Sequence, residues 1–74
     1  MELNEFVKQI ADAIEVEDVN NFSEETEFHD LDEWSSLSAL SVVTFINEEF
    51  GKELKPLDIR QCDTVLDLYK MAIQ

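Results

Sequence analysis

Residues 37–51, LSALSVVTFINEEFG, carry the strongest helical pattern in the chain and decide its fold class. Their apolar residues recur at helical spacing and cover more than half of the circumference of a helix. A helix of that kind has to contact several neighbours, so we predict that it lies at the centre of the fold. Gly51 directly follows the last apolar residue and suits the left-handed turn that ends many helices.

Three further segments are predicted to be helical, and none alternates at the period of a strand. Residues 2–16 place one apolar stripe on a helix. Pro56 suits the first turn of a short helix over residues 56–62. Thr64 and Asp67 have the spacing of a capping box at the start of a last helix within residues 63–73. We therefore predict an all-α fold: a small four-helix bundle with three longer helices and one short helix, in one domain spanning residues 1–74.

Residues 17–35 lack helical periodicity and form a long loop between the first and second helices. Loops of this length in small domains are usually functional or held by their own side chains. We predict an ordered loop rather than a linker, with Trp34 packed as a further anchor and His29, the only histidine, at the surface. Four apolar side chains are expected to anchor this loop to the core: Val19, Phe22, Phe28 and Leu31.

The formal net charge of −13 is confined to the first two thirds of the chain. Residues 1–51 contain 14 acids and one base, Lys8, whereas residues 52–74 contain four acids and four bases. This field repels phosphate backbones and anionic lipids, so we expect neither a nucleic-acid partner nor a membrane surface. It attracts basic patches on proteins and makes association salt-dependent. Solubility alone is the alternative explanation of the charge.

The chain offers little for catalysis or metal binding. Its single cysteine, Cys62, excludes an internal disulfide, and its acidic N-terminus lacks the features of a signal peptide, so we predict a cytoplasmic protein. No calcium-loop, zinc or hydrolase motif has its full set of residues. We expect no metal site and no enzymatic activity, with Cys62 as a small semi-buried filler.

Two adjacent serines, Ser35 and Ser36, lie at the N-terminal end of the predicted central helix, in DLDEWSSLSAL, residues 30–40. The simplest prediction is that the Ser36 hydroxyl caps this helix by accepting a free backbone N–H. The same helix start would favour a phosphate group attached covalently to Ser36, because its N–H groups and the helix dipole attract negative charge. The residues alone permit both roles.

The whole pattern resembles the acyl carrier protein family over essentially all 74 residues. In that family the modified serine begins the second helix, in an aspartate–serine–leucine motif. Here Ser36 and Leu37 match the second and third positions, while Ser35 replaces the aspartate; NEEFGKEL, residues 47–54, resembles the family's acidic helix end. The resemblance implies that Ser36 carries a 4′-phosphopantetheine arm, taken from coenzyme A by a phosphopantetheinyl transferase. The thiol of that arm would hold acyl groups as thioesters.

The resemblance also implies a non-catalytic, monomeric carrier that docks on acyl-transferring or condensing enzymes through their basic patches. Ser38, Ser41, Thr44 and Asn47 stand where carriers of fatty acid synthases often have acids, so fatty acid, polyketide and specialised pathways all stay open. The alternative is an unmodified acidic helical module that binds a basic protein. The residues expected to dock partners are Asp30, Asp32, Glu33, Leu37, Leu40, Ser41, Glu48 and Glu49.

Overall fold

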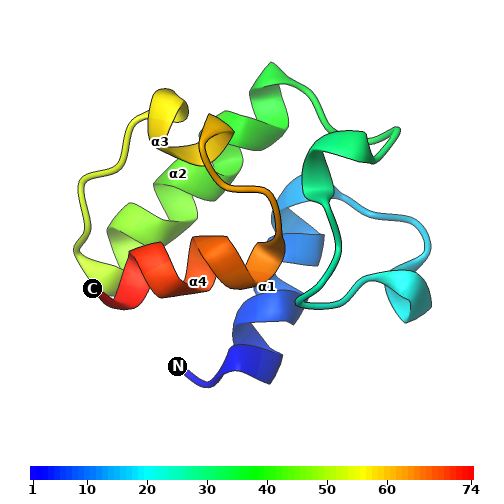
Figure 1. Cartoon of the computed structure of the whole chain (residues 1–74), viewed down its shortest axis with the longest axis horizontal. Helices are drawn as coiled ribbons and strands as arrows, with labels where there is room; N and C mark the ends of the chain where they lie inside the picture. The colour runs from blue at the N-terminus through cyan, green and yellow to red at the C-terminus, as the bar shows by residue number, and fades with distance from the viewer.

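The computed structural model describes all residues 1–74 and confirms an all-helical fold without strands (Figure 1). As predicted, three helices are longer and one is short. The connection between the first two α-helices contains two 3₁₀ turns, Val19–Asn21 and Phe28–Asp30. The α-helices are α1 (Leu3–Ile14), α2 (Ser36–Phe50), α3 (Pro56–Arg60) and α4 (Val65–Ile73).

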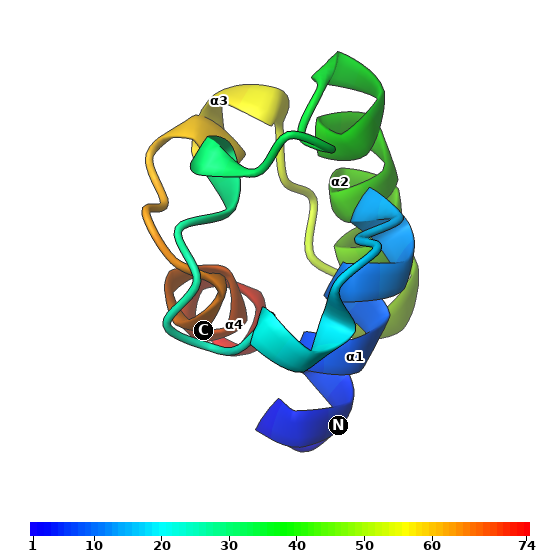
Figure 2. The same ribbon diagram turned by 90° about the vertical axis from the view of Figure 1, so that its right-hand side faces the viewer.

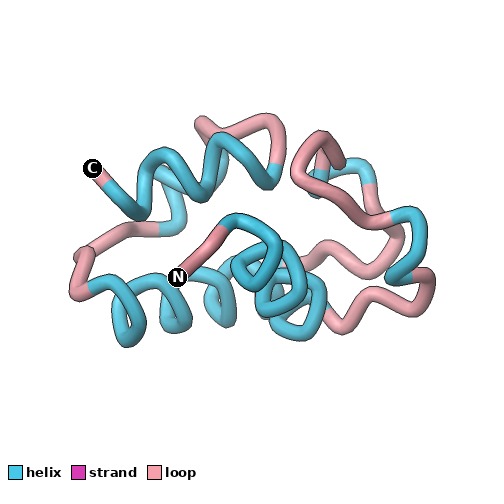
Figure 3. The backbone as a smooth tube through the Cα atoms, turned by 90° about the horizontal axis from the view of Figure 1, so that it is seen from below, coloured by secondary structure: helices cyan, strands magenta, loops and turns pink.

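Helix α2 is central, as its wide apolar surface predicts, because it contacts each of the other three α-helices. Figure 2 shows α1 beside α2, with α4 viewed end-on across the core and α3 near one end of α2. The long connection between α1 and α2 forms one end of the molecule, at the right of Figure 3. The start of α2 therefore lies where this connection returns to the bundle.

Phe6 ties three helices together at the middle of the core. Its side chain is fully buried, and its ring centroid lies 5.9 Å from that of Phe45 on α2 and 5.1 Å from that of Tyr69 on α4. Phe50, at the end of α2, approaches the same ring edge-on at 5.7 Å. Edge-to-face aromatic pairs contribute about 0.5–1.5 kcal/mol beyond the burial of their area. This cluster fixes α1 and α4 against α2.

Most of the predicted loop anchors reach the core. Phe22 and Phe28 are buried, and Leu31 packs against the core cluster while partly exposed. The prediction that Val19 anchors the loop is wrong. Val19 begins the first 3₁₀ turn, and 56% of its surface is exposed. A three-residue turn directs consecutive side chains to different sides, and here the phenylalanine that follows the turn fills the space over the core.

The prediction for His29 is also wrong, because this side chain is partly buried rather than on the surface. Its Nε2 lies 2.9 Å from the backbone carbonyl of Cys62, so it joins the loop to the connection between α3 and α4. Trp34 packs as predicted, with its ring 4.8 Å from the ring of Phe28. The loop is therefore held by contacts with a segment distant in sequence.

The remaining element boundaries differ from the predictions by one or two residues. Helix α1 ends at Ile14 and α3 at Arg60, while Gly51 ends α2 in the predicted left-handed conformation, at φ 64°.

Cys62 follows α3 and is buried. Desolvation, with a smaller effect from nearby carboxylates, raises the pKa of its thiol to about 11, so the thiol stays protonated. None of the helices combines the length and the apolar character that a membrane span requires.

Candidate functional site

The start of α2 places two serines in different roles, and the sequence prediction assigned the cap to the wrong one. Ser35 is the N-cap: its backbone is extended, and its hydroxyl oxygen accepts the N–H of Ser38 at 3.3 Å. Ser36 is the first helical residue, and its exposed side chain makes no hydrogen bond within the protein. The extended backbone that N-capping requires is found one residue earlier than expected.

Two backbone N–H groups at this helix start have no acceptor within the protein. The N–H groups of Ser38 and Ala39 are bonded to the side chain and the carbonyl of Ser35, whereas those of Ser36 and Leu37 are not bonded to the chain. The first turn also contains no acidic residue. The positive end of the helix dipole is therefore available beside the Ser36 hydroxyl, and these residues fit a covalently attached phosphate.

Ser38 secures the loop that leads into this site. It is the one buried polar residue of the chain, and its hydroxyl donates to the backbone carbonyl of Glu33 at 3.0 Å. Because that proton is already used, the Ser35 hydroxyl is the donor in its 3.3 Å contact with the Ser38 hydroxyl oxygen. The Glu33 carboxylate in turn accepts the backbone N–H of Glu17 at 3.2 Å. Ser35 is thus engaged both as acceptor and as donor, unlike Ser36.

A groove runs beside the helix start, between the C-terminal half of α1 and the exposed face of α2. Ser35 and Leu37, the neighbours of Ser36 in sequence, both line it. Of the residues predicted to dock partners, the structure brings five to this groove: Glu33, Leu37, Leu40, Ser41 and Glu48.

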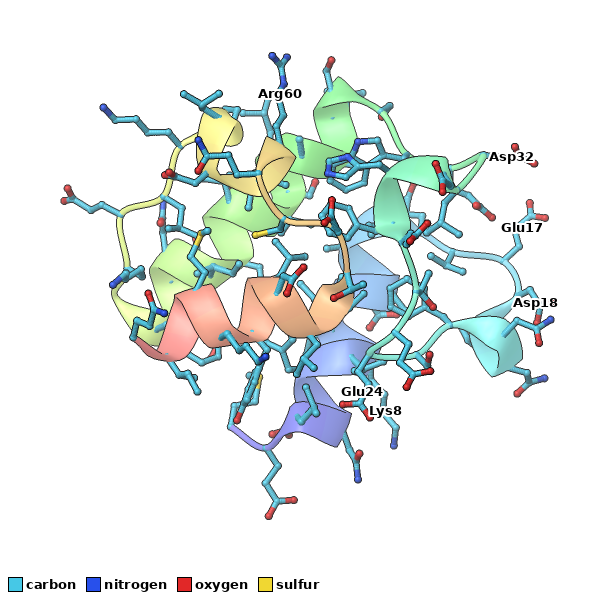
Figure 4. All side chains as sticks on the ribbon, in the orientation of Figure 1. Lys8, Glu17, Asp18, Glu24, Asp32 and Arg60 are labelled. Carbon is cyan, nitrogen blue, oxygen red and sulfur yellow. The ribbon has the colours of Figure 1, made fainter.

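The other three predicted docking residues, Asp30, Asp32 and Glu49, are exposed but lie outside the groove. Figure 4 shows Asp32 pointing into solvent at the edge of the loop, on the same side of the molecule as Glu17 and Asp18. Asp30, Asp32 and Glu49 therefore contribute to the net negative charge of the chain without lining the groove.

Sequence reasoning missed two acids of the groove, Asp12 and Glu15. Both fall near the end of α1, where the sequence shows only that they are polar, and the packing of α1 on α2 brings them opposite the hydroxyl-bearing face of α2. A helical wheel of each helix identifies its polar side, but it does not identify which polar sides meet.

The site contains no arrangement that would hold a metal ion, since no three His, Cys, Asp or Glu side chains are suitably grouped.

A family model described as "Phosphopantetheine attachment site" matches residues 4–72, which include Ser36 and most of each α-helix. No curated protein and no solved structure matches the chain significantly.

Proposed function

The chain belongs to the phosphopantetheine attachment-site family, and from this premise we propose that Ser36 is the residue that carries the arm. Domains of this family carry 4′-phosphopantetheine covalently, so the protein is a phosphopantetheine carrier protein. Such domains are generally not catalytic and serve partner enzymes as carriers. We further propose that residues 1–74 act as one carrier domain.

The single observation that carries the choice of Ser36 is the difference between its hydroxyl and those of its neighbours. Ser35 is bound as the cap of α2, and Ser38 is buried with its proton donated to Glu33. Ser36 alone combines an exposed, unbonded hydroxyl with adjacent free N–H groups. A transferase would reach it without disturbing the helix start.

In the proposed modification, Ser36 Oγ forms a bond to the phosphorus of the phosphopantetheinyl group of coenzyme A. The pyrophosphate P–O bond breaks, 3′,5′-ADP leaves, and the hydroxyl proton passes to a base of the transferase. The N–H groups of Ser36 and Leu37, which have no acceptor within the chain, would favour the negative charge of the phosphodiester. When attached, the arm supplies a terminal thiol that holds acyl groups as thioesters.

We propose a role in fatty acid, polyketide or a related specialised biosynthesis, with acyl-transferring or condensing enzymes as partners. Ser38, Ser41 and Thr44 leave the first turns of α2 without acids, which supports a dedicated carrier of a specialised pathway. The net charge of −13 disfavours self-association and supports a monomer. The single free thiol, Cys62, supports a reducing compartment such as the cytoplasm.

Intact-mass spectrometry tests the proposal most simply. The unmodified protein is incubated with coenzyme A and a broad-specificity phosphopantetheinyl transferase, beside the variants Ser35→Ala and Ser36→Ala. We expect a gain of one phosphopantetheinyl group in the protein and in Ser35→Ala, and no gain in Ser36→Ala. Loading that persists in Ser36→Ala would refute the assignment, and no loading by several transferases would favour the unmodified acidic module.

A further inference from the structure

His29 ties the segment that leads into α2 to the connection between α3 and α4. Its Nε2 lies 2.9 Å from the carbonyl oxygen of Cys62, a residue 33 positions further along the chain. Because a carbonyl oxygen can only accept a hydrogen bond, Nε2 carries the hydrogen and is the donor. Figures 1 and 2 both show the 3₁₀ turn Phe28–Asp30 beside the connection from α3 to α4.

The Cys62 carbonyl is a fixed point for this contact. Cys62 is buried, and its own N–H donates at 3.1 Å to the carbonyl of Ile59, a fully buried residue of α3. No backbone N–H donates to the Cys62 carbonyl, so the imidazole is its hydrogen-bond partner within the chain. A buried carbonyl that loses its partner is costly, and both segments would have to rearrange to satisfy it.

The imidazole of His29 also contacts Trp34, two residues before Ser36. The two ring centroids are 5.3 Å apart in an edge-on arrangement, and the centroid of the Phe28 ring lies 4.2 Å from that of the imidazole. Trp34 directly precedes the N-cap Ser35, a place where an apolar residue fixes the angle at which the chain enters a helix. Through Trp34, the imidazole therefore influences how the first turn of α2 is oriented.

The other ties of the long loop do not duplicate this one. The carbonyls of Glu24 and Thr26 hold an earlier part of the loop to the first residues of α4. The Glu33 carboxylate accepts the N–H of Glu17, which belongs to the same connection between α1 and α2. Within the segment directly before α2, only His29 extends a side-chain hydrogen bond to another part of the bundle.

We propose that His29 is a positioning residue for the loading of Ser36. Its hydrogen bond to Cys62 and its contact with Trp34 hold the start of α2 in the orientation that a phosphopantetheinyl transferase accepts. The inference rests on the proposed function, because it concerns loading of the same serine.

This role has a kinetic signature that differs from a loss of stability. Without the tie, only a fraction of the folded molecules presents Ser36 in the accepted orientation, and the apparent affinity of the transferase for the carrier falls by that fraction. The KM for the carrier therefore rises, whereas kcat, which describes the carrier already held by the enzyme, changes little. A variant that is only less stable alters neither quantity at a temperature where it is folded.

The test measures steady-state loading of the unmodified carrier by a broad-specificity transferase at saturating coenzyme A. His29→Phe keeps a ring beside Trp34 but cannot donate to Cys62, so we expect the KM for the carrier to rise about threefold to fivefold, with kcat changed less than about twofold. His29→Gln keeps an N–H donor at a similar reach and should restore the KM to within about twofold of that of the parent protein.

Asn47→Ala is the matched control. It removes another hydrogen bond between a side chain and the backbone, in which Asn47 Oδ1 accepts the N–H of Leu54 at 3.0 Å, but near the C-terminal end of α2. We expect this variant to lose stability in thermal unfolding, as His29→Phe does, while its KM stays that of the parent protein.

Trp34, the only tryptophan, reports on the tie in the free protein. Its fluorescence anisotropy should fall in His29→Phe and recover in His29→Gln, and the amide signals of residues 35–37 should shift in the same order. An unchanged KM in His29→Phe, or an equal rise in Asn47→Ala, would overturn the proposal. A raised KM without any change in these signals would also overturn it, since His29 would then contact the transferase itself.

Absence of loading in the parent protein would refute the proposed function instead. The signals of Trp34 and of residues 35–37 are measured without the arm, so their constancy in His29→Phe would refute the positioning role independently of loading.

Discussion

Helices α2 and α4 both begin after a hydroxyl side chain that caps them, but the two starts differ in what remains exposed. At α4, Thr64 Oγ1 accepts the N–H of Asp67 at 3.3 Å, and the Asp67 carboxylate accepts the N–H groups of Thr64 and Asp63 at 3.2 and 3.1 Å. At α2, Ser38 occupies the third helical position in place of an acid, so no carboxylate closes the first turn. One start has a capping box and the other has only half of one.

The long loop between α1 and α2 adds a second difference between the two helix starts. The N–H groups of Val65 and Leu66, the first two residues of α4, donate to the backbone carbonyls of Thr26 and Glu24 at 3.2 and 2.9 Å. The equivalent N–H groups of α2, on Ser36 and Leu37, have no acceptor in the chain. The α4 start is closed and stabilises the fold, whereas the α2 start keeps the donors that a phosphate attracts.

The largest effect on stability is expected at the closed start. Thr64→Ala removes the acceptor for the Asp67 N–H and should lower the free energy of unfolding by about 1–2 kcal/mol. For a domain of this size that corresponds to a fall in Tm of roughly 4–8 °C per kcal/mol. Loading of the arm at a temperature where the variant is folded should be unchanged, because the α2 start is not altered. Thermal unfolding and intact mass measure the two quantities on the same sample.

Thr64→Ser is the matched control, since it keeps the hydroxyl and should retain most of the stability. A Thr64→Ala variant as stable as the parent protein would mean that the capping box contributes nothing to the fold, and the contrast between the two helix starts would lose its energetic basis.

A smaller effect on stability is expected at the start of α2, which we call the open start because its first two N–H groups have no acceptor in the chain. Ser35→Ala removes the cap of α2 and should cost about 0.5–1 kcal/mol. Ser35→Asp should keep the stability, because aspartate is an equally good N-cap, and it restores the aspartate of the family motif that this chain lacks. Chemical denaturation of the two variants separates these outcomes. If both variants lost the same stability, the hydroxyl of Ser35 would not act through its acceptor oxygen.

The smallest effect concerns pH. The N–H groups of Thr64 and then Asp63 lower the pKa of Asp67, so its charged form is favoured by folding. Its stabilisation is therefore present above the unfolded-state value of about 3.9 and is lost as the pH falls through the lower folded-state pKa. The difference in Tm between the protein and Asp67→Asn should be widest near about pH 6 and should narrow toward about pH 3.

The comparison with Asp67→Asn is needed because acid also neutralises other carboxylates and relieves repulsion in both proteins. A difference in Tm that stays constant over this pH range would contradict the role given to the Asp67 carboxylate.

The closed start shows what sequence patterns capture well. Thr64 and Asp67 form the predicted capping box because both partners belong to one turn, where spacing alone decides which atoms meet. The carbonyls of Glu24 and Thr26 that complete this start could not be predicted, since every residue has a carbonyl and only tertiary packing selects two of them.

The open start shows the limit of the same patterns. The run SSLS at residues 35–38 offers three hydroxyls within one turn, and helix boundaries read from a pattern are uncertain by a residue or two. The cap was therefore assigned to Ser36 instead of Ser35. The acids Asp12 and Glu15 of the groove were missed for a different reason: α1 and α2 are separated by a long loop, and no sequence spacing indicates which faces pack together.

We propose that the start of α2 keeps its first two N–H groups free for the arm on Ser36. Amide NMR of the protein before and after loading tests this directly. We predict that the amide protons of Ser36 and Leu37 exchange rapidly before loading, and that their signals shift and gain protection once the arm is attached. The amide protons of Val65 and Leu66 should stay protected throughout. Ser36 and Leu37 amides that are already protected in the unloaded protein, or that do not respond to the arm, would contradict it.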